Sequence, residues 1–330
     1  MPKGINWESR IGRRLRLRDL HVLFAVVQSG SMIKAATHLG VSQPVVSEAI
    51  ADLEATIGVR LLDRSPRGVA PTLFGQALLD RSQVAFDELR QGIKDIEFLA
   101  DPTLGEVRIG CSESLTAGVL APIIDQLSRR TPRVRFQVTQ INTLNTRLEF
   151  PELRDRKLDV ILARVVETFG EFEYAEDLNV EKLLDDHLLV VAGARSPWAA
   201  RRKIDLAELA EAPWILPANS WNTLRVEEAF AAIGMKMPDV AVNTFSVALR
   251  SHLLATGRFV AAIPASTQRA DASRAPLKVL PVKLPNKPWP VAMITLKNRT
   301  LSPAVQHFLE DARAAANRMP RGRVRKPKIQ

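Results

Sequence analysis

One short predicted helix carries the residue types that read DNA bases. In segment 43–57 the apolar residues recur at helical spacing and form an inward stripe, Val46, Ala49, Ile50, Leu53 and Ile57. Small or hydrogen-bonding residues remain on the outside near its start, Ser42, Gln43, Pro44, Ser47 and Glu48. Such side chains fit a major groove, where hydroxyl, amide and carboxylate groups pair with base edges. We therefore take these five residues as candidate DNA contacts.

A second helix must hold this surface in place. The preceding segment from Ser31 has an apolar face of Ile33, Ala36 and Leu39, and Gly40 suits the left-handed residue that ends a helix. Ser31 and Ser42 are predicted helix caps, and Pro44 fits the first turn of the second helix. The short turn indicates a helix-turn-helix, although a merely structural helical hairpin shares these features.

The flanking segments extend this unit. An upstream helix is predicted from the helical spacing of Leu20, Leu23, Phe24 and Val27. Downstream, residues 59–72 form two short extended pieces around a turn, which we interpret as a wing with Arg64 and Arg67 beside its tip. Guanidinium groups there suit a phosphate backbone or a narrow minor groove. The alternative for the wing is an ordinary charged hairpin.

These residues together resemble the N-terminal signature of LysR-type transcriptional regulators. The resemblance is carried by Ser31, Ala35, Ala36, Leu39, Val41, Ser42, Gln43, Pro44, Val46, Ser47, Leu53, Glu54, Gly58, Leu61, Arg64, Pro71, Thr72 and Gly75. It covers about 17–75 by motif and the rest of the chain by pattern only. Leu62 and Glu48 depart from the family, which commonly has phenylalanine and arginine or glutamine there; Glu48 would repel phosphate or accept from cytosine.

The resemblance implies an α/β fold class with three parts. These are a winged helix-turn-helix, a long dimerisation helix and a two-lobed α/β effector domain resembling periplasmic binding proteins. It also implies double-stranded promoter DNA and a small-molecule effector as partners, with homodimers assembling into a homotetramer. RNA polymerase is a further candidate partner, and the expected location is cytoplasmic.

The predicted long helix supports self-association. From Thr72 to Leu99 the pattern is helical, and its apolar side is formed by Phe74, Leu78, Ala85, Leu89, Ile93 and Ile96. A helix this long can hardly bury that stripe within its own domain, so a second copy is the natural partner. Two recognition helices would then lie about one DNA turn apart. A packed linker within a monomer is the alternative.

Composition sets wider bounds. The 330 residues exceed the size at which one hydrophobic core keeps growing, so two or three domains are expected.

The formal net charge of +10 comes from the two ends of the chain. Residues 1–18 carry +5, residues 318–330 carry +6, and the remainder has 34 basic against 35 acidic residues. Basic tails can lie along phosphates. Solvated ends are the alternative, which is less favoured for the N-terminal tail because it leads directly into the helix-turn-helix. The single cysteine, Cys111, excludes an internal disulfide, and no secretory signal or membrane span is predicted.

Beyond residue 105, predicted strands alternate with helices. The segments 106–111, 133–140 and 158–163 are predicted strands separated by helices at 117–129 and 147–156, and a second set follows from 165. This alternation indicates parallel sheets covered on both faces and divided into two lobes. The chain is predicted to return to the first lobe through strands at 277–284 and 291–296 and a last helix at 303–317.

Polar residues follow the predicted strands where ligands of open α/β sheets bind. These candidate effector contacts are Ser112, Ser114, Asn142, Arg164, Asn219, Ser220 and Thr244. They would converge on a cleft between the lobes. The Arg164 guanidinium could hold a carboxylate with two hydrogen bonds, which favours a small organic acid or related metabolite; a surface salt bridge is the alternative for Arg164.

Other chemistries lack support in the sequence. The five histidines, His21, His38, His187, His252 and His307, show no metal-ligand spacing, and no glycine-rich phosphate loop occurs, so neither a metal nor a cofactor is predicted. Ser112 and Glu113 have no histidine nearby, and G-x-S-x-G is absent, so no catalytic residues are expected.

The predicted organisation has five parts. They are a basic extension at 1–16, a winged helix-turn-helix at 17–72, a linker helix at 73–99, an effector domain at 105–317 and a basic tail at 318–330. Within the effector domain, lobe I is predicted at 105–164 and 266–317, and lobe II at 165–265. The predicted function is a sequence-specific transcriptional regulator responding to an effector. The alternatives are an architectural DNA-binding protein without effector and, less favoured, a two-lobed enzyme with a DNA-binding tether.

Overall fold

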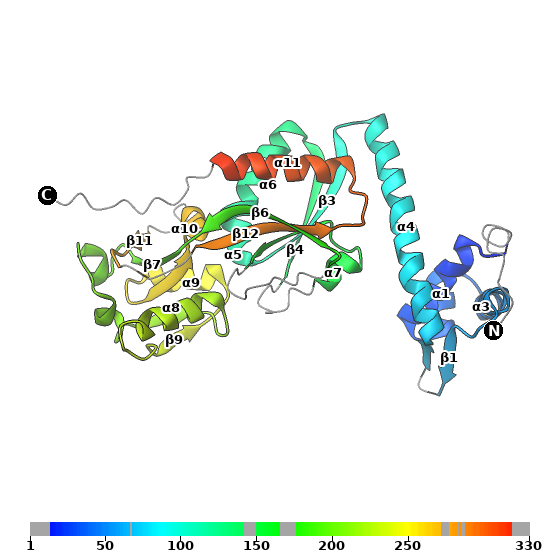
Figure 1. The fold of residues 1–330 in the computed structure, drawn as a ribbon, viewed down its shortest axis with the longest axis horizontal. Helices are drawn as coiled ribbons and strands as arrows, with labels where there is room; N and C mark the ends of the chain where they lie inside the picture. The colour runs from blue at the N-terminus through cyan, green and yellow to red at the C-terminus, as the bar shows by residue number, and fades with distance from the viewer. Residues whose placement is uncertain are drawn as a thin grey trace. The chain divides into compact units, whose positions relative to one another are not determined.

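The chain folds into two compact units, 1–90 and 91–330, whose boundary falls within one helix (Figure 1). The computed structural model describes residues 14–66, 68–141, 150–165, 176–271, 277–282, 284 and 288–318. Most of both basic tails therefore lies outside the described residues. Within the described part, no helix is both long and apolar enough to cross a membrane.

The first unit has the expected order of elements. Its helices are α1 (Leu17–Ser29), α2 (Met32–Leu39), α3 (Gln43–Ile57) and α4 (Leu73–Ala100), and its strands are β1 (Leu62–Ser65) and β2 (Gly68–Pro71). Fully buried Leu23, Val26, Ala35, Val46 and Ile50 join the first three helices in one core. The absence of a large side chain at Ala35 lets the helices approach closely.

Two local expectations for the helix-turn-helix are confirmed and three are wrong. Gly40 ends α2 with φ +66°, and Pro44 lies in the first turn of α3. Ser31 and Ser42 stand at the cap positions, but neither side chain makes a capping hydrogen bond. Ile33 was predicted to face inward and is instead 66% exposed.

The inward face of α2 is the neighbouring stripe of Met32, Ala35 and Ala36. Residues 32, 35, 36 and 39 have the same helical spacing as a stripe through Ile33. Sequence periodicity therefore allows both stripes. Packing against α1 and α3 selects the one that brings the small alanines inward.

The wing, strands β1 and β2, is anchored to the helices that flank it. The strands pair antiparallel. Glu54 Oε1 on α3 accepts hydrogen bonds from the amides of Leu61 at 2.7 Å and Leu62 at 3.2 Å. Thr72 Oγ1 donates to the Arg60 carbonyl at 2.9 Å and accepts from the Gly75 amide at 3.0 Å. A Cβ at position 75 would lie 2.0 Å from the Leu61 carbonyl oxygen, so only glycine fits there.

The second unit contains two five-stranded sheets. The first has the order β4-β3-β5-β12-β6. Its strands are β3 (Leu104–Cys111), β4 (Arg133–Gln140), β5 (Val160–Arg164), β6 (Leu178–Asp186) and β12 (Trp289–Leu296). Strand β3 pairs parallel with β4 and β5, whereas β12 pairs antiparallel with β5 and β6. The predicted parallel pairing is therefore confirmed for β3, β4 and β5 but does not extend over the whole sheet, because β12 returns antiparallel from the far part of the chain and pairs with both β5 and β6.

Helices cover both faces of this first sheet. They are α5 (Glu113–Leu115), a π-helical turn η1 (Thr116–Leu120), α6 (Ala121–Arg130), α7 (Pro151–Arg154) and α11 (Pro303–Arg318). Helices α6 and α11 lie along one face (Figure 1). Alternate residues of β5 face opposite ways: Val160 and Leu162 join the core under α11, while Ile161 and Ala163 join the core beside α7.

The second sheet has the order β11-β7-β10-β8-β9. Its strands are β7 (Leu188–Gly193), β8 (Trp214–Leu216), β9 (Val240–Asn243), β10 (Val260–Pro264) and β11 (Leu277–Val279). The other elements of this lobe are η2 (Pro197–Ala200), η3 (Leu206–Leu209), α8 (Trp221–Ala231), α9 (Val247–Ala255) and α10 (Ala265–Asp271).

The sheets correct the predicted lobe boundaries. Strand β6 belongs to the first sheet although lobe II was predicted to begin at 165, and β11 belongs to the second although lobe I was predicted to resume at 266. The chain crosses between sheets at residue 187 and again between 280 and 288. Strand β6 was missed because its alternating, half-exposed side chains, including Glu181 and Lys182, do not form an apolar run.

A buried charge cluster stabilises the base of the first sheet. The Asp159 carboxylate, 2% exposed, accepts from Arg108 at 2.6 Å and lies 2.9 Å from the Arg299 guanidinium. Burial alone would raise the pKa of Asp159, but the hydrogen bonds and charge of Arg108 and the charge of Arg299 outweigh burial and lower it. The folded structure therefore favours the ionised carboxylate.

Replacing Asp159 by asparagine should destabilise the second unit by about 3–5 kcal/mol, because the buried Arg299 and the half-buried Arg108 lose their counter-charge. Four of the five tryptophans lie in this unit, so urea unfolding followed by tryptophan fluorescence measures the change. The lowered pKa means that the stabilisation is complete above the ordinary carboxyl pKa and is lost as the pH falls through the folded value. The difference between wild type and variant should therefore shrink below about pH 4.

The matched control for this experiment is Asp155→Asn, which removes an exposed carboxylate paired with Lys157. That change should cost less than about 1 kcal/mol. An equal effect of the two substitutions would contradict the role given to the buried cluster.

Candidate functional site

The first candidate surface lies at the start of α3. Ser42, Gln43, Pro44 and Glu48 are exposed and Ser47 is half-buried, while Val46, Ile50 and Leu53 on the opposite side are buried. Helix α3 therefore presents its polar N-terminal residues outward, as expected. Arg64 on β1 of the wing is also exposed, and Arg67 lies outside the described residues.

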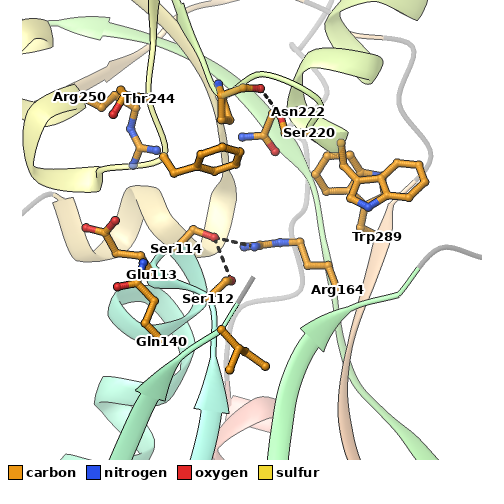
Figure 2. A pocket seen from close by; sticks show the side chains of 14 residues that line it. Ser112, Glu113, Ser114, Gln140, Arg164, Ser220, Asn222, Thr244, Arg250 and Trp289 are labelled. Carbon is orange, nitrogen blue, oxygen red and sulfur yellow. Dashed lines mark hydrogen bonds between the residues drawn. The ribbon is translucent and has the colours of Figure 1, made fainter. Parts of the chain in front are cut away.

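The second candidate site is a cavity of about 460 Å³ between the two lobes of the second unit. The carboxyl ends of β3, β4 and β5 meet it from the first lobe, and the segments after β8 and β9 meet it from the second. Five predicted effector contacts line it: Ser112, Ser114, Arg164, Ser220 and Thr244. Figure 2 shows the first three facing the last two across the cavity. We call this cavity the cleft.

Two predicted effector contacts are not placed in the cleft. Asn219 is not among the residues that line it and adopts a left-handed φ of +49° in the turn before α8. Asn142 lies outside the described residues. The remaining cleft residues were not predicted: Glu113, Gln140, Ile141, Pro217, Trp221, Asn222, Phe245, Arg250 and Trp289.

Arg164 is held by groups of the protein itself. Its Nη1 donates to Ser114 Oγ at 2.8 Å, and its Nη2 donates to Asp186 Oδ2 at 3.0 Å and to Ser266 Oγ at 3.2 Å. The side chains of Arg164 and Asp186 are 11% and 2% exposed. The expected alternative of a surface salt bridge is therefore wrong, because the pair is buried. A ligand that uses both terminal nitrogens must exchange some of these bonds.

Asp186 connects the elements that frame the cleft. In addition to Arg164, its carboxylate accepts from the Ser266 hydroxyl at 2.6 Å and the Ser266 amide at 3.1 Å. Ser266 is the second residue of α10, which packs closely on η1: a Cβ at Gly118 would lie 2.2 Å from the Ser266 carbonyl oxygen. Only glycine at 118 allows this approach, which fixes the position of Ser114 one turn earlier.

Aromatic rings form another part of the cleft wall. Trp221, Phe245 and Trp289 all line it, and Trp289 is 3% exposed. The Trp289 Nε1 atom makes no hydrogen bond with any described residue. Rings beside hydroxyl and amide groups suit a small ligand with both a flat apolar part and polar substituents. No periodic pattern pointed to these residues, because they come from three separate places: the first residue of α8, the segment after β9 and the first residue of β12.

The single thiol is not a reactive group in this structure. Cys111 ends β3 in the core beneath the cleft and is fully buried. Burial raises its pKa to about 11, and the Thr116 hydrogen bond and the charge of Arg164 offset this only in part. The thiol is therefore protonated at neutral pH. Among the described residues, no cluster of His, Cys, Asp and Glu side chains is arranged to hold a metal ion.

Comparison with known proteins identifies both units. Residues 17–76 match the family model of the bacterial regulatory helix-turn-helix protein, lysR family, and residues 100–317 match the LysR substrate binding domain. The chain belongs to the LysR family of transcriptional regulators. The resemblance inferred from the N-terminal motif is confirmed, and so is the two-lobed architecture of the effector domain.

Relatives align with this regulator over most of its length. It is 25% identical over 306 residues to the transcriptional regulator YdcI of Escherichia coli K12, covering 92% of this chain and 97% of YdcI. It is 26% identical over 321 residues to the regulator GbpR of Azospirillum brasilense, covering 95% and 90%. The regulator therefore has the DNA-binding and effector-binding parts in the family's order.

Solved structures support the same fold. The crystal structure of CbnR, a LysR family regulator, aligns with a TM-score of 0.58 at 20% identity, covering 92% of this chain and 99% of CbnR. Full-length CbnR complexed with its target DNA aligns with a TM-score of 0.51 at 21% identity, covering 92% and 100%. At this identity the likeness concerns the fold.

Proposed function

We propose that this regulator contacts the bases of its promoter through the start of α3 and binds the flanking DNA phosphate backbone through the wing. The observation that carries this proposal is the exposed polar face of Gln43, Ser47 and Glu48 on a helix whose other side is fully buried. Arg64 supplies a cation on the adjoining wing. The related CbnR has been solved with its target DNA, which supports the same use of the unit here.

Gln43→Ala or Ser47→Ala should reduce discrimination between the promoter and a scrambled duplex by about 1–3 kcal/mol, because base contacts carry sequence preference. Arg64→Ala should instead weaken binding to both duplexes alike and lower the salt slope by about one, because a phosphate contact is lost. Arg67→Ala is expected to act in the same way. Fluorescence anisotropy across a salt series measures both quantities.

The control for lost positive charge is Arg129→Ala on α6, in the other unit, where the guanidinium pairs with Asp125. A wild-type salt slope in the Arg64 variant would remove the wing from DNA recognition.

We also propose that α4 pairs with α4 of a second copy to form a homodimer, and that dimers associate into a homotetramer. Helix α4 is 28 residues long and leaves Leu89, Ile93, Ile96 and Leu99 between 52% and 80% exposed. Large apolar side chains in a continuous row on a helix are a typical dimer surface. A symmetric pair would place two α3 helices on the two halves of a palindromic site.

Ile93→Glu should raise the dimer dissociation constant by at least about 100-fold, because pairing would bury an uncompensated carboxylate. Arg81→Glu changes an exposed residue of the same helix outside this row and serves as the control. Sedimentation velocity of the full chain measures the assembly. Unchanged sedimentation of the Ile93 variant would show that α4 is not the shared surface.

The effector that we propose for the cleft is a small organic acid or related metabolite. Arg164, Arg250 and the N-terminal end of α9 bring positive charge to it, and its aromatic walls fit a partly apolar body. A ligand that contacts Ser114 in one lobe and Thr244 in the other would favour one closure of the lobes. That closure would change how subunits pack and how the DNA-binding units are spaced.

Arg164→Ala should abolish the effect of such an acid on promoter binding, measured by gel shift with acids selected from a thermal-shift screen. Because this change also leaves the buried Asp186 carboxylate without its counter-charge, the matched form is the double variant Arg164→Gln, Asp186→Asn, in which both side chains are neutral. Both variants should lose the response. A wild-type response in both would exclude Arg164 from effector recognition. We further propose that the cleft binds without catalysis, so the acid should be recovered unchanged.

A further inference from the structure

Glu113 makes a hydrogen bond that crosses the cleft. It is the first residue of α5, directly after β3 in the first lobe. Its Oε1 atom accepts from the backbone amide of Val247 at 3.1 Å, and Val247 is the first residue of α9 in the second lobe. This bond joins residues 134 positions apart across the space in which the effector is expected.

The amide that Glu113 binds belongs to the positive end of a helix. Helix α9 spans nine residues, and its first-turn amides carry partial positive charge toward the cleft. Ser246 Oγ already accepts from the Leu249 amide at 3.2 Å. Arg250, only 7% exposed, lines the cleft from the same helix. An anion placed here would be attracted by both the helix end and the guanidinium, and the anion now present is the Glu113 carboxylate.

A second cation of the cleft, Arg164, is paired with a protein carboxylate. Arg164 pairs with Asp186, whose side chain is 2% exposed and accepts three further hydrogen bonds, from the Ser266 hydroxyl and the amides of Ser266 and His187. Removing Asp186 from this position would leave several buried donors unpaired, which is costly. Glu113 differs because it is only half-buried and, among the residues that the structure describes, its carboxylate makes one hydrogen bond, to Val247. Of the two carboxylates, Glu113 is the one that a ligand can displace.

We propose that the Glu113 carboxylate occupies the position that the effector's anionic group takes when it binds. Glu113 thereby determines which ligand charge the cleft prefers. Without effector, its carboxylate occupies the end of α9 and links the lobes. An incoming carboxylate exchanges with it, so that the connection between the lobes passes through the ligand. This inference rests on the proposed binding of an organic acid in the cleft.

The first test examines the protein without ligand or DNA. Hydrogen exchange of peptides that include the start of α9 should be faster in Glu113→Ala than in wild type, because the Val247 amide loses its acceptor. Glu211→Gln, a change at an exposed glutamate of the same unit, should leave this exchange unchanged. Equal protection of α9 in the wild type and the alanine variant would overturn the proposal.

The second test measures charge selectivity with phenylacetate and its neutral analogue phenylacetamide. Both are titrated into the full chain while its intrinsic tryptophan fluorescence is followed, to which Trp221 and Trp289 of the cleft contribute. Glu113→Gln keeps the side-chain length but removes the competing charge, so it should bind phenylacetate about tenfold more tightly than wild type does. Its affinity for phenylacetamide should stay within about twofold of wild type, and Glu211→Gln should match wild type for both probes.

Phenylacetate binding by Glu113→Gln that is no tighter than in wild type, or absent, would overturn the proposal. An equal gain for the neutral amide would also overturn it, because it would indicate a change of space rather than of charge. Failure of the proposed regulatory function would appear instead as loss of promoter binding or of an acid response in the gel shift. Neither of those measurements enters these two tests, so the two failures are distinguishable.

Discussion

The buried carboxylate of Asp186 is the constraint on which the effector domain depends. Asp186 ends β6 of the first sheet, and the chain enters β7 of the second sheet after only one more residue. An ionised carboxylate at 2% exposure is tolerated only when charge and hydrogen bonds replace its lost hydration. Arg164, Ser266 and the amide of His187 supply them. The crossing between the lobes is therefore held in one geometry.

The same network positions the polar wall of the cleft. Arg164 donates to Ser114, and Thr267 on α10 donates to the Ser114 carbonyl at 3.1 Å. Gly118 allows α10 to lie against η1, which completes the attachment. On the other side of the cleft, the Glu113 side chain makes one hydrogen bond to a described residue, the Val247 amide. The contacts around Asp186 therefore hold one edge of the cleft more firmly than Glu113 holds the other, which is compatible with the lobe closure that we propose.

The DNA-binding unit uses short local contacts for a similar purpose. Glu54 ties the wing to α3, and Thr72 and Gly75 tie it to the start of α4. Because these contacts are made by the side chains that also define the family motif, the motif describes how the unit is built. Gln43 and Glu48 face outward and take no part in these contacts with the wing.

Features that depend on neighbouring residues could be predicted from the sequence. Gly40 and Pro44 mark helix boundaries because backbone dihedral preferences are properties of single residues. Strand ends located Ser112, Ser114, Arg164, Ser220 and Thr244 because parallel strands deliver their carboxyl ends to one edge. The apolar row on α4 likewise followed from helical spacing, whereas the family was inferred from a resemblance carried by the identities of the motif residues.

The tertiary structure decided what depends on partners far apart in the chain. It selected Met32 over Ile33 for the core, since helical periodicity admits either stripe until a neighbouring helix is present. It assigned β6 and β11 to their sheets, since strand pairing is a choice among distant segments. It also paired Arg164 with Asp186 and brought Glu113 to α9. The charge and hydrogen-bonding capacity of each side chain follow from the residue type. The partner that pairs with it is determined only by the fold, which brings distant residues together.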